Sequence, residues 1–454
     1  MDQEIGDQAG IKSEATAVST DTIVALASGA LPAAIAAIRI SGPKTRNVLE
    51  AFCGGVPAPR HATLRDIGPP RLPAIDRGLV IWFPAPASFT GEDMAELHTH
   101  GSRAVVSEVI EAVLSLDGTR LAEPGEFARR AFENGKLDLT QVEGLADLIS
   151  AETKAQRWQA LAQAEGSLRA LYEGWRAELL RAQALVEAGL DFADEGDVVA
   201  DVALKAEAIV TSLLASISHH LADRRGERLR DGVRIVIAGP PNVGKSSLLN
   251  ALAKRDVAIV SEEAGTTRDV LEVYLDLAGL PVILTDTAGL RESESKVEAE
   301  GVRRALSRTE QADVVLWLVD ATAPVWEPPV ALGTKPAICI VNKIDLGPQG
   351  TRQDCIEISA KTGQGLDRLI EVLEEQAALI AETGSGAPLM TRARHRAELE
   401  DARAALQRFG DAPLSPELKA EELRIAAHHV GRLTGRIDIE EVLGGIFGEF
   451  CIGK

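Results

Sequence analysis

The sequence contains little cysteine. Cys53, Cys339, Cys355 and Cys451 are the only four among 454 residues, and their spacing is not that of a metal site. So few cysteines argue against a disulfide framework, and we expect reduced thiols. Aromatic residues make up only 4% of the chain, and no apolar run approaches the length of a membrane span. Met1 to Thr20 lack the apolar core of a signal peptide. We expect a flexible tail there, on a cytoplasmic protein.

Positive charge is also scarce. The formal net charge is −20, which argues against broad electrostatic binding of nucleic acid. Any contact with RNA would need a partner protein or a local basic stretch, such as Arg224–Arg230 or Arg392–Arg396, although most such stretches are merely solvated. Hydrophobic residues at 45% and charged residues at 26% are typical of a soluble globular chain. The length suffices for about three domains.

Residues 21–125 combine short strand patterns with helical ones. Ala34–Ile40 and Leu79–Phe83 predict strands, and Ala104–Leu116 predicts a helix. Turn residues such as Gly68-Pro69-Pro70 separate these segments. The pattern indicates a small α+β domain.

Residues 126–231 are predominantly helical in pattern. Apolar residues recur at steps of three and four between Trp158 and Val186, which predicts one long amphipathic helix in a bundle. A polar, arginine-rich linker is expected at Asp223–Gly232. Helical periodicity returns between Arg392 and Phe450. We therefore expect residues 382–454 to complete the helical domain that begins at residue 126.

Residues 232–381 show strands alternating with helices, which predicts a mostly parallel sheet covered by helices. The expected strands are Arg234–Ala238, Leu271–Leu277, Val282–Thr285, Val314–Val319, Ala337–Val341 and Cys355–Ile358. This α/β module therefore interrupts the all-α domain as an insertion.

A phosphate-loop pattern follows the first of these strands, from Gly239 to Ser246. Glycines let backbone amides turn inward and surround phosphate oxygens at the start of a helix. Lys245 would reach the β- and γ-phosphates and Ser246 would bind Mg²⁺. The predicted contacts of this loop with the nucleotide are Asn242, Val243, Gly244, Lys245, Ser246 and Ser247.

Three further motifs occur in the order expected of a GTPase. Asp286-Thr287-Ala288-Gly289 follows a strand, and would hold a magnesium-bound water and sense the γ-phosphate. Asn342-Lys343-Ile344-Asp345 follows another strand, and the Asp345 carboxylate can accept two hydrogen bonds from guanine. Ser359-Ala360-Lys361 would close the base pocket. Together they predict GTP rather than ATP as the nucleotide.

The residue that orients the attacking water is less obvious. Many switch GTPases place a glutamine directly after the Asp-x-x-Gly motif, whereas this chain has Leu290 there. Glu298 is a candidate to take over this role. From its spacing alone, a solvated charge on a helix is the favoured interpretation of Glu298.

Several longer motifs resemble the tRNA modification GTPase MnmE (TrmE) family over nearly the whole chain. They are Asp21–Ala25, Arg39–Gly42, Ser88–Asp93, Pro124–Phe127, Lys136–Leu139, Ala264–Asp269 and Phe450–Lys454. The resemblance implies an N-terminal α+β domain that binds tetrahydrofolate and dimerises, a helical domain, and an inserted GTPase domain. One departure is Leu31–Ala36, where the family has a glycine-rich segment. The missing glycines stiffen that loop.

The same resemblance assigns two metal ions. Asn242, Ser261, Glu263 and Thr266 would bind K⁺, which stabilises negative charge in the transition state. Thr267 would join Ser246 on Mg²⁺, and both Thr266 and Thr267 would contact GTP. In the family pattern Glu298 positions the water, which favours the catalytic alternative for that residue.

The resemblance further implies a folate site made of Arg39, Glu96, Lys136 and Lys454. Taken singly, each of these could be a surface charge or half of an ion pair. Cys451 would lie near the one-carbon unit as a thiolate, and the alternative is a small core residue. His98 and His100 resemble a metal pair, but no third ligand is evident, so a structural role is expected.

As a whole, the resemblance implies a homodimeric GTPase that modifies the wobble uridine of tRNA. It would act with an FAD- and NADH-dependent partner, the MnmG (GidA) protein, in a heterotetramer or larger complex, adding an aminomethyl or carboxymethylaminomethyl group at carbon five. This chain has no Gly-x-Gly-x-x-Gly fingerprint, so FAD would reside on the partner. A ribosome-assembly GTPase and a mechanical GTP-driven dimer switch remain as alternatives.

Overall fold

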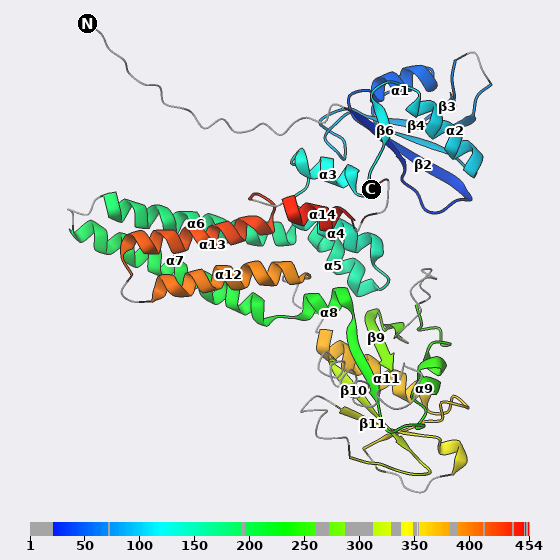
Figure 1. The fold of residues 1–454 in the computed structure, drawn as a ribbon, viewed down its shortest axis with the longest axis vertical. Helices are drawn as coiled ribbons and strands as arrows, with labels where there is room; N and C mark the ends of the chain where they lie inside the picture. The colour runs from blue at the N-terminus through cyan, green and yellow to red at the C-terminus, as the bar shows by residue number, and fades with distance from the viewer. Residues whose placement is uncertain are drawn as a thin grey trace, which may run out of the picture. The chain divides into compact units, whose positions relative to one another are not determined.

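The computed structural model describes residues 21–70, 73–191, 196–259, 272–286, 312–327, 337–347, 352, 354–381, 388–411, 414–437, 440–448, 450 and 453. The chain forms two compact units (Figure 1). The first comprises residues 1–142 together with 438–454, and the second comprises residues 143–437. Each unit is described separately below.

The first unit is built on a six-stranded sheet in the order β3-β4-β5-β2-β1-β6. Its strands are antiparallel except where β1 pairs with β6. The strands are β1 (Thr22–Leu26), β2 (Ala33–Ser41), β3 (Thr63–Ile67), β4 (Asp76–Phe83), β5 (Met94–Gly101) and β6 (Thr119–Leu121). Alternate residues such as Ile38, Val80 and Leu97 are buried in a core with α1 (Thr45–Phe52) and α2 (Arg103–Leu114). The predicted α+β character is confirmed.

The C-terminal helix α14 (Glu440–Gly448) belongs to this first unit, where it contacts α3 (Glu126–Glu133). Gly125 precedes α3 with a φ of 68°, in the left-handed region that favours glycine. A Cβ at Gly125 would lie 2.5 Å from the carbonyl oxygen of Phe447. The glycine of the Pro124–Phe127 motif is therefore required by the close approach of the chain's C-terminal segment.

The second unit contains a helical bundle. Its bundle helices are α6 (Ser167–Asp191), α7 (Gly196–Ala222), α12 (Ala393–Gly410) and α13 (Pro416–Leu433), which pack side by side (Figure 1). The first two precede the inserted module in sequence and the last two follow it, and their apolar faces form one core. The insertion of one module into a helical domain is confirmed.

The single long helix predicted around Trp158 is wrong, because two helices occupy that stretch. α5 (Lys154–Ala164) ends before Gly166, whose φ of 95° is left-handed, and α6 begins at Ser167. Leu168, Trp175 and Leu179 of α6 are buried in the bundle, whereas Trp158 of α5 is 65% exposed. The left-handed Gly166 ends α5 and changes the direction of the chain. The spacing of apolar residues continues across this point and therefore does not reveal the break.

The predicted polar linker at 223–232 is also mostly helical, as α8 (Arg225–Asp231). The segment Asp201–Asp231 is long and apolar enough to cross a membrane, with a mean hydropathy of 1.2, which the sequence analysis did not expect. Val210, Leu213 and Ile217 in that segment are buried in the bundle core. Only 22% of the apolar stretch in that segment is buried, so packing in the bundle accounts for these three residues and not for the apolar composition as a whole.

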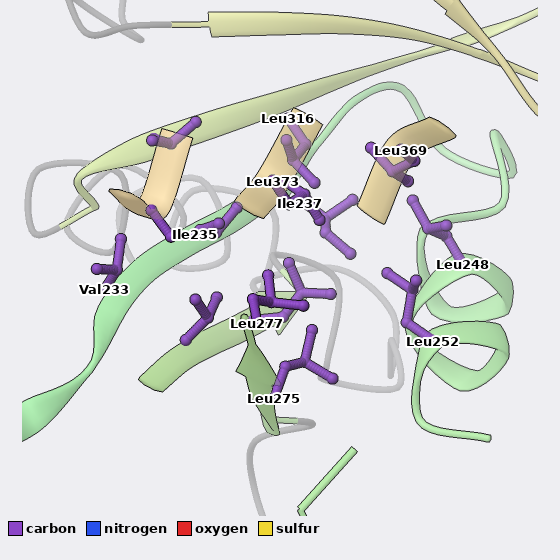
Figure 2. Packing of buried hydrophobic residues seen from close by; sticks show 14 of the residues in the cluster. Val233, Ile235, Ile237, Leu248, Leu252, Leu275, Leu277, Leu316, Leu369 and Leu373 are labelled. Carbon is purple, nitrogen blue, oxygen red and sulfur yellow. The ribbon is translucent and has the colours of Figure 1, made fainter. Parts of the chain in front are cut away.

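The inserted module has a six-stranded sheet in the order β12-β11-β10-β7-β9-β8, parallel except for β8. The strands are β7 (Val233–Ala238), β8 (Glu272–Leu277), β9 (Leu280–Asp286), β10 (Val314–Asp320), β11 (Ala337–Asn342) and β12 (Ile356–Glu357). Figure 2 shows apolar side chains of these strands packed with those of α9 (Lys245–Leu252) and α11 (Leu366–Ala381). The predicted parallel α/β module is confirmed.

The expectation of four reduced cysteines is wrong for two of them. Cys339 on β11 and Cys355, directly before β12, form a disulfide. The residues lie far apart in sequence, and only the pairing of β11 with β12 brings them together. Cys53 is buried with a free thiol, and burial raises its pKa to about 12.

Candidate functional site

The phosphate loop connects β7 to the start of α9, as the motif requires. Gly239 and Gly244 have positive φ values of 157° and 102°, and Asn242 has a φ of 62°. A Cβ at Gly239 would lie 2.6 Å from the carbonyl oxygen of Leu318, and one at Gly244 would lie 2.3 Å from Nδ2 of Asn342. Both glycines are therefore fixed by the neighbouring backbone and by a base-pocket residue.

Lys245 is the first residue of α9, and its side chain bends back over the loop. Nζ donates to the carbonyl oxygens of Gly239 at 2.9 Å and Pro240 at 3.0 Å. Burial lowers the pKa of Lys245, and the nearby carboxylate of Asp286 opposes this effect. A cation held over the loop fits the phosphate groups of a nucleotide.

Ser246 and Asp286 meet at the other side of the loop. The Ser246 hydroxyl donates to Oδ2 of Asp286 at 2.6 Å, which joins the start of α9 to the end of β9. A hydroxyl and a carboxylate oxygen at one point are the hard ligands that Mg²⁺ prefers. These two residues therefore fit the magnesium site predicted from the sequence.

The predicted base pocket is assembled by Asn342 at the end of β11. Its Nδ2 donates to the Val243 carbonyl oxygen at 2.9 Å, and its Oδ1 accepts from the Ala360 amide at 3.0 Å. Ser359 donates to Oδ1 of the exposed Asp345 at 2.7 Å. The buried Asn342 thus ties the phosphate loop to the Ser359–Lys361 loop, while the carboxylate of Asp345 is held in place for a base.

One residue of this site escaped the sequence reasoning. Asp320 ends β10 directly opposite Asn342, and its Oδ2 accepts from Nζ of Lys343 at 2.6 Å. Nζ of Lys343 also donates to the carbonyl oxygen of Asn242 at 2.7 Å. The missed signal was that Asp320, like Asp286 and Asn342, is a polar residue at the carboxyl end of a buried parallel strand.

Ten predicted site residues lie outside the described part of the chain: Ser261, Glu263, Thr266, Thr267, Thr287, Ala288, Gly289, Glu298, Cys451 and Lys454. Their roles stay predictions. Of the four expected K⁺ ligands, Asn242 alone is described, and it is exposed.

In the first unit, the structure brings together two residues of the predicted folate set. NH2 of Arg39 on β2 donates to Oε1 of Glu96 on β5 at 3.0 Å. The guanidinium of Arg39 also lies 5.6 Å from the ring centre of Phe89 and 5.7 Å from that of Phe127. Lys136 donates from Nζ to the Pro86 carbonyl oxygen at 3.0 Å. A cation, a carboxylate and two rings fit a flat heterocycle with polar edges.

Gly453 connects the C-terminal motif to the same sheet. It has a φ of 97°, and a Cβ there would lie 2.1 Å from the carbonyl oxygen of Leu26. Leu26 ends β1, whose Ala25 pairs with Arg39 on β2. The chain's end therefore lies against the strand beside Arg39, and only glycine fits there.

A buried charge cluster accounts for several motif residues that the sequence reasoning left without a role. Arg130 is 2% exposed and bonds Asp21 at 2.8 Å, Glu92 at 3.1 Å and Glu126 at 3.0 Å. Burial raises the pKa of Glu126, but hydrogen bonds led by that from Arg120 outweigh it and hold the pKa below its usual range. The cluster joins four segments of the unit, which explains why charged residues recur in their motifs.

The two histidines of β5 each contact a carboxylate. His98 Nε2 lies 3.2 Å from Oε2 of Glu96, and His100 Nδ1 lies 2.8 Å from Oδ1 of Asp76. The described residues contain no group of three or more possible ligands that could hold a metal ion. These contacts accord with the structural role expected for the pair.

The two basic stretches proposed for RNA contact are largely neutralised within the second unit. Arg228 bonds Asp313, Arg230 and Arg392 both bond Asp147, Arg394 bonds Glu143, and Arg396 bonds Glu227. Each pair is 3.0 Å or shorter. These arginines stabilise the fold, so we do not assign them to RNA.

Comparison with known proteins accords with this arrangement. A family model for the MnmE helical domain matches residues 139–451, and one for the GTP-binding protein TrmE N-terminus matches residues 22–136. The tRNA modification GTPase MnmE of Parvibaculum lavamentivorans is 54% identical over 449 residues, covering 96% of this chain and all (100%) of that protein. That of Rhodopseudomonas palustris is 51% identical over 460 residues, covering 96% and 99%. The chain belongs to the tRNA modification GTPase MnmE family.

Proposed function

We propose that the protein hydrolyses GTP as part of its role in tRNA modification. The observation that carries the proposal is that four nucleotide motifs converge at the carboxyl edge of one parallel sheet. Asn342 contacts both the phosphate loop and the base loop, and Ser246 meets Asp286. Together with family membership, this arrangement supports a nucleotide site rather than a structural turn.

Each predicted residue of the nucleotide site has a definable role in binding or hydrolysis. The phosphate-loop amides and Lys245 would neutralise the β- and γ-phosphates, and Asp345 would pair with guanine while Ser359 fixes its orientation. Ser246 and Thr267 would hold Mg²⁺, which would neutralise charge on the phosphates, and Asp286 would hold a magnesium-bound water. The exposed Asn242 would bind K⁺ together with Ser261, Glu263 and Thr266. Glu298 would orient water in place of the glutamine that Leu290 replaces.

Hydrolysis rates in different salts test the GTPase part of the proposal. GTP turnover by the full chain should be faster in KCl than in NaCl at equal ionic strength, because the proposed monovalent site selects by ion size. Asn242→Ala should remove the difference while leaving Na⁺ rates unchanged. Equal rates of the unmodified protein in both salts would overturn potassium activation, and absence of turnover in both would overturn the GTPase itself.

The first unit is proposed to bind a tetrahydrofolate derivative through Arg39, Glu96, Lys136 and Lys454, with Cys451 assisting transfer of its one-carbon unit. The Arg39–Glu96 pair, the two rings near the Arg39 guanidinium and the close packing of Gly453 against Leu26 support this assignment. Calorimetric titration with a reduced folate should give saturable binding that Arg39→Ala weakens. No heat of binding would favour the alternative of a mechanical GTP-driven switch, which needs no folate.

The proposed setting is a homodimer that works with an FAD-dependent MnmG partner to modify carbon five of the tRNA wobble uridine. Cys451→Ser should leave GTP hydrolysis intact and abolish modification. Full modification by this variant would refute the thiol's chemical role. A ribosome-assembly GTPase is the other alternative, and it would show ribosome association and unchanged tRNA nucleosides.

A further inference from the structure

The disulfide between Cys339 and Cys355 lies between the two segments that build the base pocket. Cys339 is three positions before Asn342 along β11, and Cys355 is four positions before Ser359. The loops that follow these cysteines meet at the Asn342–Ala360 and Asp345–Ser359 hydrogen bonds. The disulfide and these hydrogen bonds at the base pocket therefore connect the same two segments.

The strand that follows Cys355 makes few backbone contacts with the sheet. β12 is the edge strand and comprises only Ile356 and Glu357. Its register with β11 consists of two pairs, Ile340 with Ile356 and Val341 with Glu357. Beyond these, Ile358 donates its amide to the Val341 carbonyl oxygen at 2.8 Å. A covalent bond at such an edge adds to the packing of the buried Ile358 in fixing the position of the next loop.

The disulfide is also accessible to small molecules. Both cysteines are only partly buried, at the border of an apolar cluster that includes Trp317 and Val341. The other described cysteine, Cys53, is 1% exposed. Small oxidants and reductants can therefore reach the Cys339–Cys355 pair far more readily than Cys53.

We infer that Cys339 and Cys355 form a reversible redox site that sets how tightly the protein holds guanine nucleotides. In the oxidised form the bond fixes β12 on β11, so the base loop is positioned before the nucleotide arrives. In the reduced form this tie is lost and the base pocket must be ordered by the nucleotide itself, which weakens binding. The inference rests on the proposed GTP binding and adds a regulatory input to it.

The chemistry balances with a hydroperoxide as oxidant. One thiolate attacks a peroxide oxygen of H₂O₂, which forms a sulfenic acid and releases hydroxide that is protonated to water. The second thiol attacks the sulfenic sulfur, the S–S bond forms, and a second water leaves. A dithiol reverses the step by thiol–disulfide exchange, reducing the bond to two thiols while it becomes a disulfide itself.

The test is the release of a fluorescent GDP analogue from the full-length protein after treatment with H₂O₂ or with dithiothreitol. Peptide mapping before and after alkylation reports whether Cys339 is linked to Cys355. We expect the reduced protein to release GDP about fivefold faster, as the loss of one element of preorganisation implies. Cys355→Ser and Cys339→Ser should each release at the reduced rate under both treatments, and Cys53→Ser should keep the full response.

The outcomes distinguish a failure of the redox inference from a failure of the proposed nucleotide binding. Equal release rates from protein whose mapping shows the bond formed and broken would overturn the redox inference while GTP binding stands. Failure of peroxide to link the two cysteines would also overturn it. Absence of GDP binding under both treatments would overturn the proposed nucleotide site itself.

Discussion

The nucleotide loops and the Arg130 cluster differ in how many of their polar residues are exposed. Asp345, Asn242 and Ser246 are exposed on loops or at a helix start, where a ligand can reach them. Arg130 is buried, and protein carboxylates surround its guanidinium. Both regions consist of polar residues in recognisable motifs. The difference teaches that a motif can mark a fold's internal support as readily as a binding site. Lys245 and Asp286 of the nucleotide site are buried as well, so the distinguishing feature is the presence of exposed polar residues beside them.

The largest expected effect comes from removing the charge of Arg130. Arg130→Met leaves carboxylates buried without their cation, so the first unit should lose about 4 kcal/mol of stability. Hydrogen exchange should accelerate in β1, β5 and α3 but not in β7 or β10. Arg129→Met, on the same helix with a side chain 36% exposed, is the control and should cost under about 1 kcal/mol. Similar losses of stability in both variants would show that the buried cluster contributes no more to stability than an exposed ion pair does.

A second buried cluster, in the second unit, should make that unit sensitive to acid. Burial lowers the pKa of His395, so His395 is neutral, with Nε2 at 2.8 Å from Oε2 of Glu143. Burial would raise the pKa of Glu143, but hydrogen bonds with His395 and Arg394 hold it well below its usual range. Tyr172 contacts the other ring nitrogen of His395 at 3.4 Å. This places an ionised carboxylate beside a neutral imidazole and a guanidinium.

The sign of the pH effect follows from these lowered pKa values. Below the unfolded histidine pKa of about 6.5, the unfolded chain takes up a proton that folded His395 refuses, so stability falls by up to about 1.4 kcal/mol per pH unit. Glu143 adds to the loss below about pH 4.3 in the same direction. Urea denaturation followed by exchange in α6 and α12 should show the fall between pH 7 and 5. His395→Gln should flatten it, and an unchanged slope in that variant would contradict the neutral imidazole.

Changing the exposed base-pocket carboxylate should affect binding and leave the fold intact. Asp345→Asn replaces one acceptor oxygen by a donor, which opposes a donor of guanine, and we expect roughly 30-fold weaker GTP binding. Xanthosine triphosphate, which presents a carbonyl at that edge, should gain affinity. Competition with a fluorescent GDP analogue measures both ligands. A loss for both nucleotides alike would point to damage of the loop rather than altered recognition.

The smallest effect is expected at Ser359, which positions this carboxylate and also accepts a hydrogen bond from the Thr362 amide. Ser359→Ala removes the hydrogen bond to Asp345 and should weaken GDP binding about fivefold, near 1 kcal/mol. The same competition assay applies, with Thr362→Ala on the same loop as a control for general loosening. If Ser359→Ala binds GDP as tightly as the unmodified protein, then Asp345 needs no internal support.

Much of the nucleotide site was predictable because its chemistry is local. Each motif lies within a few residues at the end of one strand, so Lys245, Asp286 and Asn342 could be assigned before their contacts were known. The helix break at Gly166 and the short helix α8 were missed because apolar spacing does not register a left-handed glycine or a polar helix. The spacing of apolar residues shows which side of a helix or strand faces the core, but it indicates only weakly where that helix or strand ends.

The remaining features depend on residues far apart in sequence. The Arg130 cluster joins Asp21 to Glu92 and Glu126, and the disulfide joins Cys339 on β11 to Cys355 just before β12. The spacing of these residues in the sequence does not predict the ion pairs or the disulfide, because only the fold brings the residues together. The motif positions of Asp21 and Glu92 were recognised from family resemblance, whereas their common partner Arg130 was not.

The most direct test of the proposed function is mass spectrometry of nucleosides from total tRNA of cells that lack this chain. Cells complemented with the unmodified chain serve as reference, and cells complemented with Asp345→Asn test the need for the nucleotide site. We predict that aminomethyl-type wobble uridines vanish without the chain, return with the unmodified protein and stay reduced with the variant. Unchanged levels of these nucleosides in cells without the chain would contradict a role in tRNA modification.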